Sequence, residues 1–190
     1  MSQLEITALS ASPQVRAMLS ELLIETVTNG GSVSFMHPLS LETAHAFWDG
    51  AFSAAARDER LILGAWEGAM LIGTVTLLLD CPPNQPHRAE IAKMMTCPRH
   101  RNRGVATALL RTAEDFAARR GRTLLVLDTA TDGGAAKLYE KLGFHLAGEI
   151  PDFALKPHGG LTGTLIYYKR VGGESEPAGG GARDLSHDLP

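Results

Sequence analysis

Apolar residues in the first third of the chain recur mainly at the spacing of amphipathic helices. One such segment follows Ser12-Pro13 and ends at Asn29-Gly30-Gly31, and a second follows Ser40. Serine at an N-cap and proline in the first turn are typical of helix starts, and glycine is typical of helix ends. The pattern predicts two helices. Their inward-facing residues are expected to be Val15, Met18, Leu22 and Thr26 in the first, and Leu41, Ala44, Trp48 and Phe52 in the second.

The rest of the chain alternates strand-like and helix-like patterns. Residues 61–66 and 71–79 predict a hairpin that turns at Glu67-Gly68, and a third strand starts at Arg88. A helix from Val105, closed by Gly121, precedes the apolar run 124–128, which predicts a strand covered on both faces and parallel to its neighbour. A helix over 132–142 and strands over 144–149 and 164–169 complete an α/β fold. We expect a mixed sheet with helices on both faces.

The composition fits one compact domain. The chain has 190 residues, of which 44% are hydrophobic and 21% charged, so it can build a core without metal or disulfide support. We assign the domain to residues 1–170 and predict a disordered tail over 171–190, whose glycine-rich sequence offers little apolar surface for ordering. The two cysteines make no disulfide framework, and the seven histidines lack metal-ligand spacing. We therefore expect reduced thiols and no metal.

Charge and segment composition narrow the partners further. The net charge is −3, and no extended basic face with aromatic residues is evident, which argues against nucleic-acid binding. The first five residues lack the basic start and apolar core of a signal peptide, and no apolar run approaches membrane-spanning length. A cytoplasmic protein without membrane contact is the expectation. No exposed apolar stripe demands an oligomer, so a homodimer stays open.

The most informative segment runs from 89 to 110, where a strand ends at Pro98 and Arg101-Asn102-Arg103-Gly104-Val105-Ala106 opens a helix. The first turn of a helix leaves backbone N–H groups without intrahelical partners, and the helix dipole adds positive potential there. Gly104 and Ala106 keep bulk away from an approaching anion, and the arginines add charge. The segment predicts a phosphate-binding loop.

This loop lacks the G-x-G-x-x-G fingerprint of dinucleotide folds and the Lys-Ser or Lys-Thr ending of a P-loop. It reads Arg-x-x-Gly-x-Ala and is followed by Leu138-Tyr139-Glu140-Lys141-Leu142-Gly143-Phe144. The two motifs, in this order, resemble the GNAT superfamily of acetyl-coenzyme A-dependent N-acetyltransferases, over roughly residues 3–170. The resemblance implies a twisted, mostly antiparallel mixed sheet with a splayed parallel strand pair. It also implies acetyl-coenzyme A as cosubstrate, with its pyrophosphate on the Arg-x-x-Gly-x-Ala loop and its thioester beside Tyr139.

Four further segments are similar to the tabtoxin-resistance acetyltransferases, a branch that acts on a small amine-bearing toxin. They are Gly30-Gly31-Ser32-Val33-Ser34-Phe35-Met36, Arg88-Ala89-Glu90-Ile91-Ala92-Lys93-Met94, Leu127-Asp128-Thr129 and Gly148-Glu149-Ile150-Pro151. Asp132 departs from the family, because many relatives carry Asn there at the start of the last helix. Asp also serves as an N-cap, so the departure bears on a polar contact to the cofactor rather than on the fold.

Acetyl transfer to an amine requires removal of a proton from the ammonium form, since a lysine-like amine has a pKa of about 10.4. Glu90 and Asp128 are the candidate proton acceptors and ammonium anchors, acting through water or with a pKa raised by burial. The resemblance implies the same two residues. It also implies a bulged strand near Met94 or Met95, whose backbone N–H meets the thioester carbonyl. Tyr139 is expected to donate a hydrogen bond to the sulfur.

The candidate site residues form three sets. The catalytic set is Glu90, Asp128 and Tyr139. The cofactor set is Met94, Met95, Thr96, Arg101, Asn102, Arg103, Gly104, Val105, Ala106, Thr107, Asp132, Ala135 and Tyr139. The substrate set is Phe35, Met36, His37, Glu90 and Asp128. The pocket rim is expected at residues 30–37 and at the Gly- and Pro-containing loop 151–162.

Each assignment has a structural alternative. Glu90 would otherwise be a surface carboxylate of an edge strand, Asp128 a cap of the turn at 129–131, and Tyr139 a packing residue; the arginines would form a solvated face. For the function, we expect transfer to a small amine, with an amino-acid-like toxin or antibiotic as the candidate, in a ternary complex without a covalent cysteine intermediate. A protein or peptide N-acetyltransferase and a non-catalytic acyl-coenzyme A sensor are the alternatives.

Overall fold

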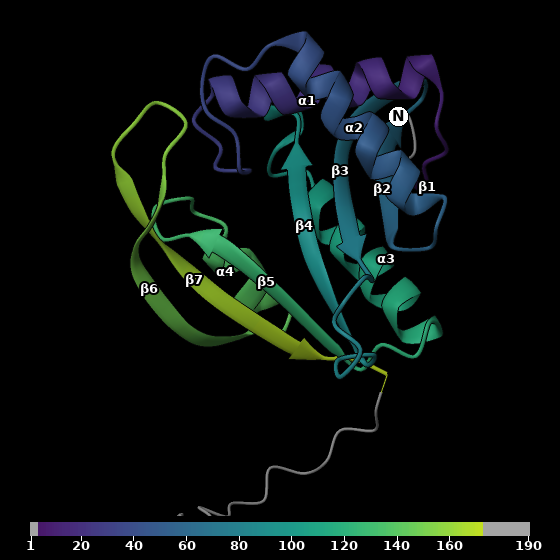
Figure 1. Cartoon of the computed structure of the whole chain (residues 1–190), viewed down its shortest axis with the longest axis vertical. Coiled ribbons are helices and arrows are strands. Elements are labelled where there is room, and N and C mark those ends of the chain that lie inside the picture. Colours follow the sequence, from purple (N-terminus) through teal and green to yellow (C-terminus); the bar gives the residue numbers. More distant parts are fainter. Residues whose placement is uncertain (1–3, 173–190) are drawn as a thin grey trace, which may run out of the picture.

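The computed structural model describes residues 4–172, which form one seven-stranded sheet flanked by helices (Figure 1). The strands lie in the order β1-β2-β3-β4-β5-β7-β6, and β4/β5 is the one parallel pair among them. The strands are β1 (Leu4–Ala8), β2 (Arg60–Glu67), β3 (Met70–Leu78), β4 (Arg88–Thr96), β5 (Leu124–Ala130), β6 (His145–Leu155) and β7 (Leu161–Arg170). The helices are α1 (Pro13–Thr28), α2 (Leu41–Ala55), the 3-10 turn η1 (Pro98–His100), α3 (Val105–Arg119) and α4 (Ala136–Lys141). The mixed-sheet prediction is confirmed.

The first two helices begin where the sequence predicts. Ser12 Oγ accepts a hydrogen bond from Val15 N–H at 3.1 Å, and Ser40 Oγ accepts one from Thr43 N–H at 3.1 Å. Trp48 is fully buried on the inner face of α2. Leu41, by contrast, is 52% exposed, because the first residue of α2 lies beyond the edge of the packed face; its predicted inward position was wrong.

Alternation of side chains gives the N-terminal half of the sheet two packed faces. Ile62 of β2 packs with α1 and α2, whereas Leu61 and Leu63 on either side of it pack with α3. Figure 1 shows α1 and α2 crossing one face and α3 lying behind the other. The sheet is therefore sandwiched between helices over β2 to β4.

The C-terminal half is covered less completely. Leu125 and Leu127 of β5 are buried, but Leu124 and Val126 are half-buried and Asp128 is exposed. The prediction that this strand is parallel to β4 is confirmed, whereas the prediction that both of its faces are covered was wrong. The reason is that α1 and α2 pack over β2 to β4 and leave the same face of β5 without a helix.

Other bounds also differ from the sequence prediction. The last helix starts at Ala136 rather than at 132, and β6 extends to Leu155, so residues 151–155 belong to a strand and not to a loop. Val171 still packs on the core and donates its N–H to Thr123 O at 3.0 Å. The rest of the predicted tail, from 173, lies outside the described residues. Within 4–172, no helix is long and apolar enough to cross a bilayer, and no cluster of His, Cys, Asp and Glu is arranged to hold a metal ion.

The burial difference within α2 generates a stability prediction. Trp48→Ala should lower the free energy of unfolding by about 3–5 kcal/mol, because it removes a fully buried aromatic side chain and leaves a cavity. Leu41→Ala, on the same helix, should cost less than about 0.5 kcal/mol because Leu41 is a surface residue. Urea denaturation of both variants measures the difference. Equal losses would contradict the described packing of α2.

Candidate functional site

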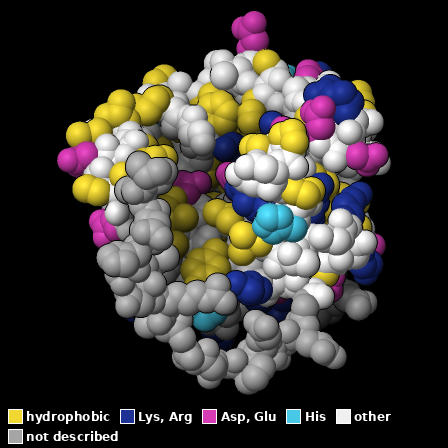
Figure 2. All heavy atoms as spheres, turned by 60° about the horizontal axis from the view of Figure 1, so that its bottom comes forward, with side chains coloured by type: hydrophobic (Ala, Val, Ile, Leu, Met, Phe, Trp, Pro, Cys, Tyr) yellow, Lys and Arg dark blue, Asp and Glu magenta, His cyan; other side chains and the backbone are white. Residues whose placement is uncertain are grey.

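The sheet opens between β4 and β5. These strands pair at three positions, Arg88 with Leu124, Ala89 with Leu125 and Glu90 with Val126. Beyond Glu90 the two strands diverge, as Figure 1 shows. Figure 2 views the molecule from the side of the β4–β5 junction and shows a hollow in this face. Hydrophobic side chains lie on the floor of the hollow, and charged side chains of both signs lie around it.

A bulge in β4 lies beside this opening. On β3, Thr76 pairs with Ala92 and Thr74 pairs with Met95, so Lys93 and Met94 together oppose Val75. Lys93 has a φ of 50°, a left-handed conformation that is uncommon for residues other than glycine. The bulge expected near Met94 and Met95 is present. Because β5 has already diverged, the β4 backbone groups that face the opening lack a strand partner.

The loop after β4 leads into the first turn of α3. Gly104 is the N-cap, with φ 81°, and no side chain caps the helix. The first helical hydrogen bond runs from Ala108 N–H to Gly104 O at 3.0 Å, which leaves the N–H groups of residues 105–107 without an intrahelical acceptor. The first turn contains no acidic residue. Its chemistry suits an anion, which the dipole of the helix would also attract.

The arginines of this loop are not equivalent. Arg103 Nη2 donates to Glu67 Oε1 at 2.6 Å, and His100 Nε2 lies 3.2 Å from Glu67 Oε2. The hydrogen bond from Arg103 is the main reason that the pKa of Glu67 lies below its usual range. Arg101 is exposed and its side chain forms no hydrogen bond with a described residue. The sequence analysis read Glu67 only as part of a turn and missed its link to the loop.

The two predicted carboxylates lie on one face of the sheet. Ala89, Ile91, Leu125 and Leu127 point to the α3 side, so Glu90 and Asp128 point to the side of α1 and α2. Glu90 Oε2 accepts from Arg88 Nη1 at 3.3 Å, and Asp128 Oδ2 accepts from Thr164 Oγ1 of β7 at 3.2 Å. Asp128 is therefore held by a neighbouring strand and does not cap the turn at 129–131.

Tyr139 lies on α4 in the core beneath the sheet. It is 5% exposed, and its ring packs against Phe144 and Tyr167 with centroids 5.8 and 6.0 Å away. Burial, and next the charge of Asp128, raise its pKa to about 12. The hydroxyl is thus protonated at neutral pH, and no described residue accepts a hydrogen bond from it. Tyr139 is both a packing residue and an available donor.

Lys93 is a charged group near this site that the sequence analysis did not assign. Its Nζ donates to Ser34 Oγ at 3.1 Å and lies 5.7 Å from the centroid of the Phe47 ring. Burial lowers the pKa of Lys93, while the negative charges of Asp128 and Glu90 oppose that effect. In the sequence, Lys93 stands out only as a lysine in an otherwise apolar end of a strand. That pattern does not reveal the bulge, which directs the Lys93 side chain toward Ser34.

A bridge spans the α1/α2 side of the opening. We use this name for the contacts between the α1–α2 loop and the turn at 156–160 that joins β6 to β7. His37 N–H donates to Pro157 O at 2.9 Å, the His37 and His158 rings lie 4.5 Å apart, and His158 Nε2 donates to Thr28 O at 3.0 Å. The bridge therefore joins the two halves of the molecule across the side that carries the carboxylates.

The predicted substrate residues have different surroundings. Phe35 packs edge-on against Phe47 with centroids 5.2 Å apart, His37 belongs to the bridge, and Met36 is 45% exposed. The structure thus places Phe35 at the edge of the α1/α2 core and His37 at the rim. The pocket rim at 30–37 stays a prediction. Of the second predicted rim, 151–162, only residues 156–160 form a turn, because 151–155 belong to β6 and 161–162 to β7.

Asp132 does not cap the last helix, contrary to expectation. The N-cap of α4 is Ala135, which has no side-chain cap, and Asp132 lies in the preceding turn. Its carboxylate accepts from Lys156 Nζ at 3.2 Å and from Thr162 Oγ1 at 3.1 Å, and the Lys156 hydrogen bond is the main cause of its lowered pKa. Asp132 thus ties the turn before α4 to the β6–β7 hairpin.

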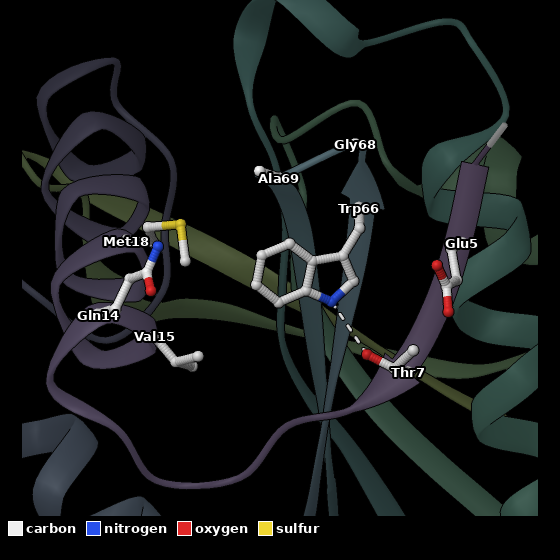
Figure 3. Close-up of a pocket in the computed structure, with 8 residues that line it drawn as sticks. All are labelled: Glu5, Thr7, Gln14, Val15, Met18, Trp66, Gly68 and Ala69. Atoms are coloured by element: carbon white, nitrogen blue, oxygen red, sulfur yellow. Dashed lines mark hydrogen bonds between the residues drawn. The ribbon is translucent and has the colours of Figure 1, made fainter. Parts of the chain in front are cut away.

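A separate pocket lies away from these groups. It has a volume of about 330 Å³ between α1 and the edge formed by β1 and β2, and Figure 3 shows Trp66 crossing it with Nε1 donating to Thr7 Oγ1 at 3.0 Å. None of the predicted catalytic, cofactor or substrate residues lines it. We therefore centre the candidate site on the β4–β5 opening.

Known proteins resemble this chain in sequence and in fold. The profile of the Acetyltransferase (GNAT) family matches residues 22–144, more than half of the chain. Rat N-acetyltransferase 8 is 35% identical over 91 residues, which cover 45% of this chain and 41% of that protein. The chain thus spans less than half the length of this curated relative.

Two solved structures share the fold. An N-acetyltransferase from Staphylococcus aureus Mu50 has a TM-score of 0.75 at 19% identity, with 89% of this chain and 99% of that chain covered. A phosphinothricin acetyltransferase from Sinorhizobium meliloti, solved in complex with acetyl-coenzyme A, has a TM-score of 0.74 at 20% identity, with 90% of each chain covered.

The α3 N-terminus generates a binding prediction. Gly104→Ala should weaken coenzyme A binding roughly tenfold, because a Cβ at φ 81° costs about 1–2 kcal/mol and shifts the N–H groups of the first turn. A Cβ there meets no atom within 4 Å, so the cost arises from the backbone alone. Isothermal titration with coenzyme A measures the change. Gly50→Ala in α2, where space is also open, is the control; an unchanged affinity in Gly104→Ala would contradict the assignment of this loop.

Proposed function

Because this chain belongs to the Acetyltransferase (GNAT) family, we propose that it transfers the acetyl group of acetyl-coenzyme A to the amine of a small molecule. Acetyl-coenzyme A, when bound, supplies an activated thioester as the acetyl donor. The family and the enzyme class agree with the prediction from the sequence. The substrate, the acceptor site and the residue roles below are the proposal.

The residues around the opening fit the cofactor. The open N–H groups of 105–107, the left-handed Gly104 and the exposed Arg101 would hold the pyrophosphate. The β4 backbone at Met94 and Met95, which has no strand partner on the β5 side, would receive the pantetheine arm. The Tyr139 hydroxyl would face the sulfur. Arg103 would contribute less than predicted, because Glu67 already binds its guanidinium. Thr96, Asn102 and Ala135 stay predicted cofactor contacts.

The opposite face of the opening would receive the acceptor amine. At neutral pH only on the order of one lysine-like amine in a thousand is unprotonated, given a pKa of about 10.4. Glu90 and Asp128 point to this face, so they would anchor the ammonium form and remove its proton through water. The two strands thus separate the cofactor loop from the carboxylates, and the reacting atoms would meet between them.

The bridge is the observation that favours a small acceptor. A protein or peptide substrate needs an open groove for its chain, whereas the contacts of His37 with Pro157 and of His158 with Thr28 join the two halves over the acceptor side. A phosphinothricin acetyltransferase shares the fold, which supports an amino-acid-like toxin or antibiotic as the acceptor class. Placement in the tabtoxin-resistance branch stays a prediction from the sequence motifs.

Direct transfer in a ternary complex is the proposed chemical route. The thiol of Cys97 is packed within the α1/α2 core, and the thiol of Cys81 donates to Arg88 O at 3.3 Å. The Cys97 thiol is thus enclosed in the core, and the Cys81 thiol is held by the backbone of β4 at its paired end, before the opening. A covalent acetyl-cysteine step therefore has no support from their positions.

The test of the proposed function is release of coenzyme A thiol from acetyl-coenzyme A with a panel of acceptors. The panel contains amino acids, tabtoxinine-β-lactam, phosphinothricin, aminoglycosides, polyamines and short peptides. Saturable release with a small amine supports the proposal. Release with peptides alone would contradict the small acceptor, and coenzyme A binding without release from any acceptor would favour a sensor.

The carboxylate pair separates an enzyme from a sensor. Glu90→Gln combined with Asp128→Asn should lower kcat/KM roughly a hundredfold to ten-thousandfold, because both groups that accept or relay the amine proton lose their charge. Coenzyme A affinity should not change, because the cofactor loop at the start of α3 lies on the other face of the sheet from both carboxylates. Steady-state kinetics and titration calorimetry give the two readouts. Unchanged turnover would contradict the proposed roles.

Tyr139→Phe tests the role of the phenol. Full proton transfer from a phenol of pKa about 12 to a thiolate of pKa about 8.5 is uphill by roughly 5 kcal/mol. We therefore expect a hydrogen-bonding role and a tenfold to hundredfold loss of kcat, with the wild-type rate showing no ionisation of Tyr139 up to about pH 10. A loss beyond about ten-thousandfold would instead make Tyr139 an obligatory acid.

A further inference from the structure

The acceptor face of the opening carries more positive than negative side chains. Strand alternation and register place Arg60, Glu90 and the intervening Leu78 in one row across β2, β3 and β4, on the same face as Arg88. The face thus carries three cations, Arg60, Arg88 and Lys93. It carries two carboxylates, Glu90 and Asp128. An ammonium group alone, bound at such a face, would meet a surplus of its own charge.

Lys93 differs from Arg88 in lacking a carboxylate partner among the described residues. Arg88 is paired with Glu90 at 3.3 Å, whereas Lys93 forms no ion pair with any described residue. Its one polar contact is the neutral Ser34 hydroxyl, and an ammonium has two further donors to offer. Ser34, with φ 72°, and Lys93, with φ 50°, are both left-handed, so the hydrogen bond joins two unusual backbone positions across the acceptor side.

From this placement we propose that Lys93 binds a carboxylate of the acceptor, so that the substrate is an amino acid or an analogue that carries its amine and its acid group close together. The inference rests on the proposed function. Glu90 and Asp128 would take the ammonium end, and Lys93 would take the carboxylate end. Arg60, whose Nε is buried without a hydrogen-bond partner among the described residues, adds positive potential beside it. A polyamine, which has no acid group, would be excluded by the same surplus of positive charge.

The partial burial of Lys93 strengthens this recognition. Burial lowers its pKa, so an acceptor carboxylate would restore a favourable environment for the charged form. Lys93 is half-buried beside the Phe47 ring, and a charge pair is stronger where water is scarce. Lys93 would thus select an acid group and fix the direction in which the amine enters.

Matched acceptors test the inference by activity. An amino acid and its carboxamide share the amine and differ in the negative charge. We expect wild-type kcat/KM to favour the acid, and the acid-to-amide ratio to fall at least tenfold in Lys93→Gln but to be kept largely in Lys93→Arg. The different basicity of the two amines cancels when ratios are compared between variants. Lys141→Gln, at an exposed position of α4, is the control for loss of a lysine charge.

A binding readout separates this inference from the proposed function. N-acetyl amino acids and their carboxamides are titrated into the protein saturated with coenzyme A, which requires no turnover. The acid should bind at least tenfold more tightly than the amide in the wild type and equally in Lys93→Gln, with thermal unfolding confirming that the variant folds. Failure of coenzyme A to bind would overturn the proposed function. Equal affinity for acid and amide in the wild type, no binding of either, or an equal loss for both in Lys93→Gln would overturn the role of Lys93.

Discussion

The short parallel contact between β4 and β5 is the constraint on which the rest of the site depends. Three paired positions hold the two halves of the sheet together, and divergence begins immediately after Glu90. A continued ladder would satisfy the β4 backbone and leave no passage between the faces of the sheet. Because the strands part, one face presents the first turn of α3 and the other presents the carboxylates, with a gap between them.

The charges follow from this division. A helix N-terminus without acidic residues or a side-chain cap faces one side and suits an anion. The other side holds Glu90, Asp128 and Lys93, charges of both signs that suit a ligand with both an ammonium and an acid group. The bridge then limits the space on that side. The proposed direction of transfer is a consequence of where the sheet opens.

Features set by neighbouring residues could be predicted from the sequence. The serine caps, the hairpin at Glu67-Gly68 and the helix start at Gly104 each depend on a few adjacent residues. The strand patterns also placed Glu90 and Asp128 on two successive strands, which lie side by side. The family resemblance supplied the bulge of β4, which is present, whereas the role of Tyr139 beside the thioester stays a prediction.

Features set by distant contacts could not be predicted. Asp132 resembles a helix cap in sequence, but Lys156 and Thr162 bind it from a hairpin that follows later in the chain. Lys93 was overlooked because lysine seldom adopts a positive φ, so nothing local indicates that a bulge aims it at Ser34. The bridge joins Thr28 and His37 to residues 157 and 158, which only the closure of the sheet brings together.

A crystal structure of the protein with acetyl-coenzyme A tests the central claim most directly. We expect the pyrophosphate on the N–H groups of residues 105–107, the arm between β4 and β5, and the sulfur within hydrogen-bond distance of the Tyr139 hydroxyl. The acetyl group should face Glu90 and Asp128. A cofactor bound elsewhere, such as in the pocket beside Trp66, or one whose acetyl group points away from the carboxylates, would contradict the account.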